Sequence, residues 1–205
     1  MKAQITMKTV IIFDHPYTMA ASNNIPHFRS YSAALAKHTQ EFLEANGDSV
    51  DVIDLDADQF DPVMHQEDLT NWRMRRSISP QADDYYERIN NADRLIFIFP
   101  VWWELMPAMM KGFIDKVFAK GKLVSTHPKV LLAKRPQIDV FTVAGTPTPL
   151  YKLYFRQPVV NALYRGTFKK LGMKHFKWLN FTPERQSEAK RIASLKRVDK
   201  VLQAK

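Results

Sequence analysis

The chain of 205 residues contains no cysteine. This absence excludes disulfide bridges, thiol nucleophiles, and zinc or iron–sulfur sites built on thiolates. Glycine is also scarce, with six in the whole chain. None of them lies in the loop directly after the first strand-like apolar run at residues 10–13. The glycine-rich fingerprint of a Rossmann dinucleotide site is therefore missing, and so is the Walker A phosphate loop.

Long hydrophobic runs are missing as well. The apolar run at residues 10–13 is much shorter than the roughly 7–15 residues of a secretory signal. No stretch approaches the ~18 apolar residues of a membrane span. We therefore expect a soluble cytoplasmic protein with no membrane span. Its 45% hydrophobic and 12% aromatic residues suffice for a buried core, so the disordered and fibrous classes are excluded.

The net charge of +9 is confined to one part of the chain. Residues 165–205 hold 12 Lys or Arg and 3 Asp or Glu, whereas residues 1–164 hold 18 of each. This basic tail is either a solvated helix face or a docking surface for an anionic cofactor, lipid or partner. It carries no groove-reading motif, and charge alone binds nucleic acid only non-specifically, so we predict no nucleic-acid partner. The six histidines show no metal-ligand spacing, which predicts no metal site.

Apolar runs alternate along the chain with amphipathic segments. Strands are predicted at residues 9–14, 49–55, 94–100, 138–145 and 174–181, and helices at 31–46, 80–92, 107–118, 158–173 and from Pro183 onward. The tail helix would place Ile192, Leu195, Val198 and Leu202 on its inner face. Alternating strands and helices predict an α/β fold with a five-stranded parallel sheet covered on both faces. We expect a single domain over residues 1–205, with a core of about 8–182 and a basic helical extension at 183–205.

Ligands of such sheets bind at the carboxyl ends of the strands, where the strand order reverses. The loop after Asp14 carries His15, several hydroxyl side chains and Arg29 ahead of a helix. Such groups at a helix N-terminus form an anion site, because the helix dipole favours negative charge there. The alternative is a long polar loop whose side chains only cap and turn the backbone.

The two following loops carry aromatic and hydroxyl groups. "PVWWEL", residues 100–105, places two tryptophans at a turn, where they would either cover a flat ring or pack on neighbouring loops or a partner subunit. "VAGTPTPLY", residues 143–151, supplies a flexible glycine, threonine hydroxyls and Tyr151. Phosphate chemistry, aromatic faces and a phenol together favour a flavin.

Three motifs occur in a familiar order. "HPY" after the first strand, "DLDADQFDPVM" after the second and "FPVWWELMPAMMKGFIDKVF" around the third resemble the NAD(P)H:quinone oxidoreductase family, the DT-diaphorase-like flavoproteins. The resemblance covers most of residues 8–182. It implies a flavodoxin-like three-layer sandwich and a homodimer with the flavin at the subunit interface. It also implies ping-pong transfer of a hydride from NAD(P)H to a quinone-like acceptor.

The resemblance also implies site residues. His15 and residues 30–32 would contact the phosphates and ribityl chain, residues 100–104 would line the ring, and residues 143–146 would pass under its pyrimidine end. The implied cofactor-binding residues are His15, Ser30, Tyr31, Ser32, Pro100, Val101, Trp102, Trp103, Glu104, Val143, Ala144, Gly145, Thr146 and Tyr151. Tyr151 would also be catalytic, offsetting charge as the hydride arrives. Gln157 stands where relatives with a tyrosine–histidine relay have histidine, which puts such a relay in doubt.

Two other functions share these motifs or this fold. One is an accessory flavoprotein that docks on a potassium-efflux transporter. The other is a flavodoxin-type electron carrier, which the neutral core and basic tail disfavour because such carriers present acidic surfaces. The choice between FMN and FAD stays open, as does the choice between NADH and NADPH.

Overall fold

A computed structural model describes residues 6–23, 30–125 and 131–203 of the chain. Its strands are β1 (Lys8–Phe13), β2 (Ser49–Asp54), β3 (Arg94–Pro100), β4 (Gln137–Val143) and β5 (Phe176–Phe181). All neighbouring strands run parallel, in the order β2-β1-β3-β4-β5. The predicted five-stranded parallel sheet is therefore confirmed, with strand ends displaced by one or two residues.

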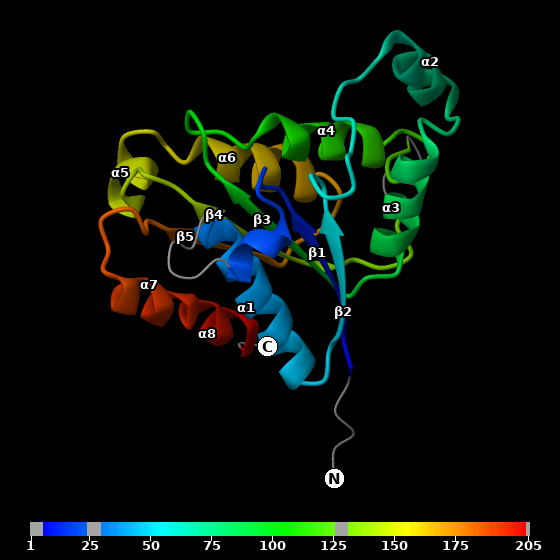
Figure 1. Ribbon diagram of the computed structural model, residues 1–205. Helices are drawn as coiled ribbons and strands as arrows, with labels where there is room; N and C mark the ends of the chain where they lie inside the picture. The colour runs from blue at the N-terminus through cyan, green and yellow to red at the C-terminus, as the bar shows by residue number, and fades with distance from the viewer. Residues whose placement is uncertain (1–5, 24–29, 126–130, 204–205) are drawn as a thin grey trace.

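Helices cover both faces of this sheet (Figure 1). One layer contains α3 (Pro80–Asn90), α4 (Ala108–Val117), α6 (Pro158–Val160) and the π-helix η2 (Asn161–Phe168), and the other contains α1 (Tyr31–Ala45), α7 (Glu188–Leu195) and α8 (Arg197–Gln203). The short helices η1 (Met19–Asn23) and α5 (Thr148–Leu153) follow β1 and β4. Successive side chains of a strand point to opposite faces. Accordingly Val10 and Ile12 join one buried cluster, while Ile11 and Phe13 join the other.

The helix starts follow from capping residues. Ser30 Oγ accepts a hydrogen bond from Ala33 N at 3.1 Å, and Ser79 Oγ accepts one from Ala82 N at 3.1 Å. Each bond satisfies an amide that has no acceptor within its own helix. Pro80 occupies the first turn of α3, as predicted. None of the described helices is long and apolar enough to cross a membrane.

The tail differs from the predicted single helix. Two short helices occur, α7 and α8. Ile192 is half exposed, yet it lines a small cavity with Tyr31 and Ala34 of α1, so it lies on the side of α7 that faces α1. Val198 and Leu202 are buried in the cluster that α1 forms with the sheet. At its C-terminal end α8 is also held by Lys177 Nζ, which donates to Val201 O at 2.9 Å. The tail therefore packs on the sheet rather than lying free in solvent.

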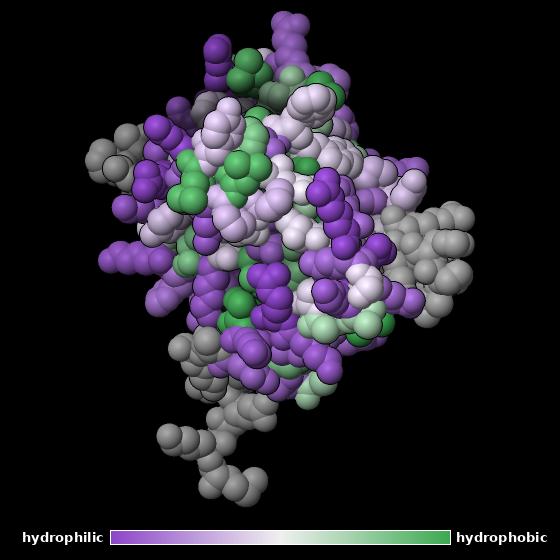
Figure 2. Space-filling view, turned by 90° about the vertical axis from the view of Figure 1, so that its left-hand side faces the viewer, coloured by the Kyte–Doolittle hydropathy of each residue, from purple (hydrophilic) through white to green (hydrophobic). Residues whose placement is uncertain are grey.

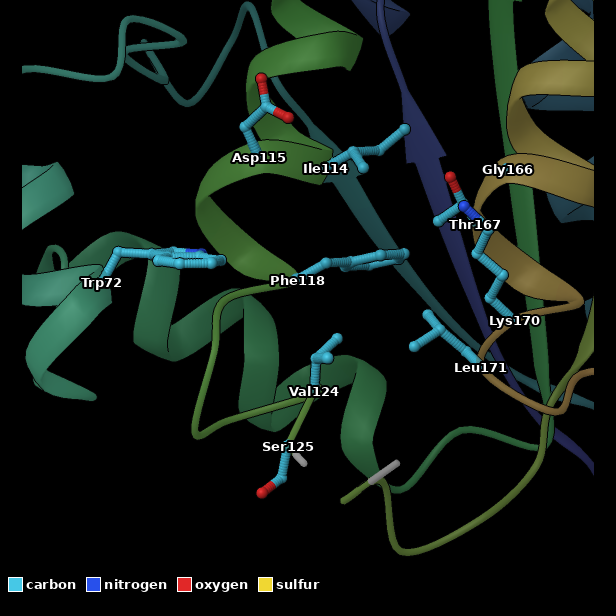
Figure 3. Close-up of a pocket in the computed structure, with 10 residues that line it drawn as sticks. All are labelled: Trp72, Ile114, Asp115, Phe118, Val124, Ser125, Gly166, Thr167, Lys170 and Leu171. Carbon is cyan, nitrogen blue, oxygen red and sulfur yellow. The ribbon is translucent and has the colours of Figure 1, made fainter. Parts of the chain in front are cut away.

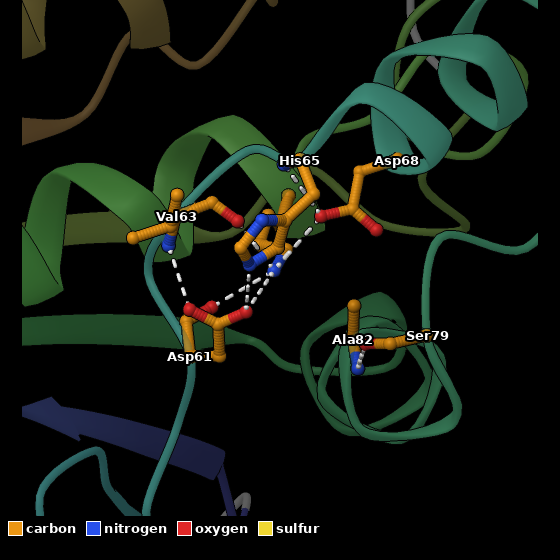
Figure 4. A network of polar contacts seen from close by, with 7 residues as sticks. Asp61, Val63, His65, Asp68, Ser79 and Ala82 are labelled. Atoms are coloured by element: carbon orange, nitrogen blue, oxygen red, sulfur yellow. Dashed lines mark hydrogen bonds and ion pairs between the residues drawn. The ribbon is translucent and has the colours of Figure 1, made fainter.

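A protruding arm that was not predicted from the sequence carries α2 (Gln66–Met74) (Figure 1). Lys116 of α4, which is 4% exposed, anchors the arm. Its Nζ donates to Asp61 O at 3.0 Å and Val63 O at 2.8 Å, and lies 3.1 Å from Asp68 Oδ2. His65 N also donates to Asp68 at 3.0 Å (Figure 4). These long-range contacts, and not an apolar stripe, fix the arm.

Candidate functional site

The predicted site residues lie at the carboxyl edge of the sheet. β2 and β3 flank β1 on opposite sides, so the strand order reverses there. In open α/β sheets this reversal opens the crevice that holds ligands. The loops after β1, β3 and β4 all begin at this edge. The starts of the loops after β3 and β4 are joined by a hydrogen bond, in which Val101 N donates to Val143 O at 2.7 Å.

The loop after β1 begins with two titratable side chains. Asp14 is 1% exposed, and its Oδ2 accepts a hydrogen bond from Met110 N at 2.7 Å. Burial raises the pKa of Asp14 to about 7. His15 accepts a hydrogen bond from Tyr17 N at Nδ1 (3.1 Å), and burial lowers the pKa of its imidazole. A neutral His15 therefore keeps Nε2–H as its donor.

At the start of α1, two predicted phosphate contacts have other partners. Ser30 Oγ serves as the N-cap, and the Tyr31 hydroxyl hydrogen-bonds Ser194 Oγ of α7. Ser32 is buried. An anion at this end would therefore meet the free first-turn amides of α1 rather than the Tyr31 hydroxyl. Arg29, which was predicted to contribute, lies outside the described residues.

The loop after β3 forms a tight hairpin turn. Trp102 N donates to Leu105 O at 3.0 Å, and Leu105 N donates to Trp102 O at 3.1 Å. The two residues between them, Trp103 and Glu104, have φ values of 49° and 63°. Left-handed backbone at non-glycine residues is strained, and it persists only where the surroundings enforce it. The Trp103 side chain is 99% exposed at the tip of this turn.

Side chains from the following loop hold the turn in place. Thr146 Oγ1 donates to Glu104 Oε1 at 2.8 Å, and the Tyr151 hydroxyl donates to Glu104 O at 2.9 Å. The same hydroxyl accepts a hydrogen bond from Val159 N at 3.1 Å. Glu104 Oε2 is buried and has no hydrogen-bond partner among the described residues. This orphaned acceptor is suited to an N–H or O–H group of a ligand.

The loop after β4 lies beside this turn. Ala144 N donates to Phe181 O at 2.9 Å, which continues the β4–β5 pairing. Gly145 lies against a carboxylate, because a Cβ there would be 3.1 Å from Glu184 Oε1. No acceptor within the described part of the chain pairs with the backbone amides of Trp103, Glu104, Gly145 or Thr146. The edge thus offers several unused donors beside one unused acceptor.

A model of the family described as having the flavodoxin-like fold matches residues 7–202. The chain belongs to this family. The match ends at residue 202, within α8, so it includes α7 and nearly all of α8. The three-layer arrangement expected from the sequence motifs is thereby confirmed.

Three proteins illustrate its likeness to other family members. An uncharacterised NAD(P)H oxidoreductase from Haemophilus influenzae is 28% identical over 173 residues, covering 82% of this chain and 80% of the relative. The NAD(P)H:quinone oxidoreductase structure from Methanothermobacter marburgensis is 23% identical, with a TM-score of 0.80 and 96% of both chains covered. An FMN-dependent NADH-azoreductase from Bacillus anthracis, solved with FMN, is 16% identical, with a TM-score of 0.74 and 96% and 97% covered.

Exposed hydrophobic side chains surround the edge in this flavodoxin-like chain. Leu153 and Tyr154 of the α5 region are 82% and 75% exposed, and Trp102 and Trp103 lie in the neighbouring loop. Figure 2, which faces the side of α5 and α7, shows hydrophobic and near-neutral residues gathered in its upper half, while hydrophilic residues predominate below. An apolar rim of this kind is typical of a binding site or a subunit interface.

A cavity lies away from this edge, against the helices of the α4 layer. It has a volume of about 630 Å³ and is lined by residues of α2, α4, the following loop and η2 (Figure 3). Apolar side chains such as Trp72, Phe118 and Leu171 form most of its wall, with Asp115 and Lys170 among its polar members. None of its lining residues was predicted as a site residue, because four separate segments contribute to it and no local motif marks them.

Proposed function

We propose that this protein is a flavin-dependent oxidoreductase that transfers a hydride from NAD(P)H, through the flavin, to a quinone or a similar acceptor. The observation that carries the proposal is the Trp102–Leu105 turn, where unpaired amides lie beside exposed indole rings. The relatives, whose names refer to NAD(P)H, quinone and FMN, support the same activity.

The donor set fits a flavin ring. An isoalloxazine presents carbonyl and ring-nitrogen acceptors together with one ring N–H donor. The amides of Trp103, Glu104, Gly145 and Thr146 would serve the acceptors, and Glu104 Oε2 would accept from the N–H group. Trp102 and Trp103 would cover one side of the ring. The remaining predicted contacts, Pro100, Val101, Val143 and Ala144, are backbone neighbours that hold these groups in place.

The bound flavin would supply the redox chemistry, accepting two electrons as hydride and passing them on. This chain's residues would orient the ring, exclude water and donate hydrogen bonds to it. His15 Nε2 and the first-turn amides of α1 would bind the phosphate end. A direct catalytic role for Tyr151 stays a prediction, and so does the ping-pong order of substrates.

A homodimer is part of the proposal. Trp103, Leu153 and Tyr154 are large and highly exposed, and a second copy of the chain would bury such a rim while closing the site over the acceptor. The acceptor would be a quinone, or an azo compound of the kind named for the azoreductase relative.

The test is a visible absorption spectrum of the purified protein, repeated after anaerobic addition of NADPH or NADH. We expect flavin bands that bleach with a nicotinamide and return when a quinone is added. Flavin bands that respond to neither nicotinamide would favour the electron carrier or the transporter-docking flavoprotein. A protein that binds no flavin, even after reconstitution, would refute the proposal. Extraction of the bound flavin then distinguishes FMN from FAD.

A further inference from the structure

The Tyr151 side chain lies buried between two turns. It is 1% exposed, and its ring packs at 5.8 Å from that of Trp178. Its hydroxyl donates to Glu104 O and accepts from Val159 N. A phenol has one proton to donate, so that proton is already committed to the protein.

Each of the two turns contains consecutive left-handed residues. Trp103 and Glu104 form the first pair, and Arg156 and Gln157, with φ values of 56° and 46°, form the second. Tyr151 contacts both. Its hydroxyl binds Glu104 O in the first turn, and its carbonyl accepts from Gln157 N at 2.9 Å in the second. Strained pairs of this kind persist only where neighbouring contacts enforce them.

We propose that Tyr151 is a positioning residue, whose hydroxyl fixes the Trp102–Leu105 turn through the Glu104 carbonyl so that the turn's free amides meet the ring of the ligand. This inference rests on the proposed flavin function. It differs from the catalytic role that the resemblance implies, because Tyr151 acts through Glu104 and does not touch the ligand.

Two further observations agree with this role. Burial raises the pKa of Tyr151 to about 12, so the phenol keeps its proton at neutral pH and remains a donor to Glu104 O. Thr146 supplies a second contact to the same residue, at the Glu104 carboxylate. Two neighbours of one loop therefore hold a single residue of the turn, one by its backbone and one by its side chain.

The experiment compares Tyr151→Phe and Thr146→Val with a control, Tyr85→Phe. Tyr85 is also 1% exposed, and its hydroxyl donates to Asp58 Oδ2 at 2.8 Å, remote from the turn. Flavin affinity is measured by fluorescence titration of the flavin-free proteins. The rate of reduction by NADPH is measured at saturating flavin over a range of pH.

We expect Tyr151→Phe to weaken flavin affinity about tenfold, and Thr146→Val by a similar factor, as loss of a buried hydrogen bond predicts. The double variant should lose less than the product of the two factors, because both contacts fix the same residue. At saturating flavin, NADPH should reduce the flavin of Tyr151→Phe at a rate within about twofold of the parent's rate. The pH profile of this rate should be unchanged. Tyr85→Phe should leave flavin affinity unchanged.

The opposite pattern would overturn the inference. A catalytic hydroxyl would leave flavin affinity intact in Tyr151→Phe while lowering the saturated rate or shifting its pH profile, and Thr146→Val would then have no effect.

Amide hydrogen exchange of the flavin-free protein separates this inference from the proposed function. In Tyr151→Phe, faster exchange is expected at the hydrogen-bonded amides of the two turns even if the parent binds no flavin, a result that would refute only the function. These amides belong to Val101, Trp102, Leu105, Gln157 and Val159. Unchanged exchange at these residues would refute the positioning role, whether or not flavin binds.

Discussion

Replacing Asp14 with asparagine should change how the stability of the protein depends on pH. The carboxyl is 1% exposed, and burial is the main cause that raises its pKa from 3.8 to about 7. Asp56 and Asp54 raise the pKa further, while the hydrogen bond from Met110 N lowers it. An asparagine side chain keeps an oxygen for Met110 N, and its amide can donate to the neighbouring Asp56 carboxylate, whose buried Oδ2 has no partner among the described residues.

The raised pKa of Asp14 determines how the stability changes with pH. The folded state binds the Asp14 proton more tightly than the unfolded state, so the ionised carboxylate destabilises the fold fully above about pH 7. This penalty shrinks as the pH falls from about 7 towards 3.8 and is lost below that value, where both states are protonated. A shift of about three pKa units corresponds to about 4 kcal/mol at most. Asp14→Asn should therefore be more stable than the parent by up to ~4 kcal/mol at pH 8, and most of this difference should be lost by pH 4.

The assay is urea unfolding of the flavin-free protein, followed by circular dichroism at constant ionic strength from pH 4 to 8. For a domain of this size each kcal/mol shifts the melting temperature by about 2–4 °C, so a thermal scan gives a second reading. Asp93→Asn is the control of opposite sign, because Lys134 lowers the pKa of Asp93 and its contribution is lost as pH falls. Parallel pH profiles for Asp14→Asn and the parent would refute the assignment.

Three further predictions test the site, the arm and the tail. Trp103→Ala should weaken flavin retention without moving the unfolding midpoint, because the side chain is 99% exposed, and an unchanged flavin content would contradict its role. Lys116→Met should lower the free energy of unfolding by about 3–5 kcal/mol and make α2 sensitive to proteolysis. Lys111→Met, which breaks the exposed ion pair with Asp115, should lower it by less than about 1 kcal/mol. Removing α8 should lower the free energy of unfolding by about 3–5 kcal/mol, because the buried side chains of Val198 and Leu202 are lost and the apolar surface that they cover is exposed. A truncated protein that unfolds at the same urea concentration as the parent would favour the solvated-tail interpretation.

The fold could be predicted because its signals are local and repeated. After Arg94, β3 reads as an uninterrupted apolar run in the sequence, and all seven residues of the strand are buried at the centre of the sheet. The starts of α1 and α3 follow from Ser30 and Pro80, which cap or open a helix by short-range contacts. The carboxyl edge then follows from the parallel order of the strands, so the loops of the candidate site were found without knowledge of any tertiary contact.

The arm could not be predicted, because its support comes from distant residues. Within α2 only Asp68 is buried, so no apolar stripe identifies the helix. Its anchor, Lys116, lies 48 positions further along the chain and looks like an ordinary surface lysine of α4. Asp14 was also missed as a group of interest, although a carboxylate at the end of an apolar strand was a visible signal of a perturbed pKa.

For two of the candidate site residues, the contacts predicted from the sequence motifs differ from the contacts in the structure. Motif position suggested Tyr31 for a phosphate, yet its hydroxyl binds α7 at Ser194 and its ring packs at 5.8 Å on that of Phe181. Tyr151 likewise points its hydroxyl at Glu104 and Val159. In both cases a tyrosine beside the candidate site connects a segment with unpaired backbone amides to the rest of the described fold. Because backbone amides carry no side-chain signature, a site built from them appears in the sequence only through the residues that hold them in place. The basic tail is one such support, since α7 holds Tyr31 at the N-terminus of α1.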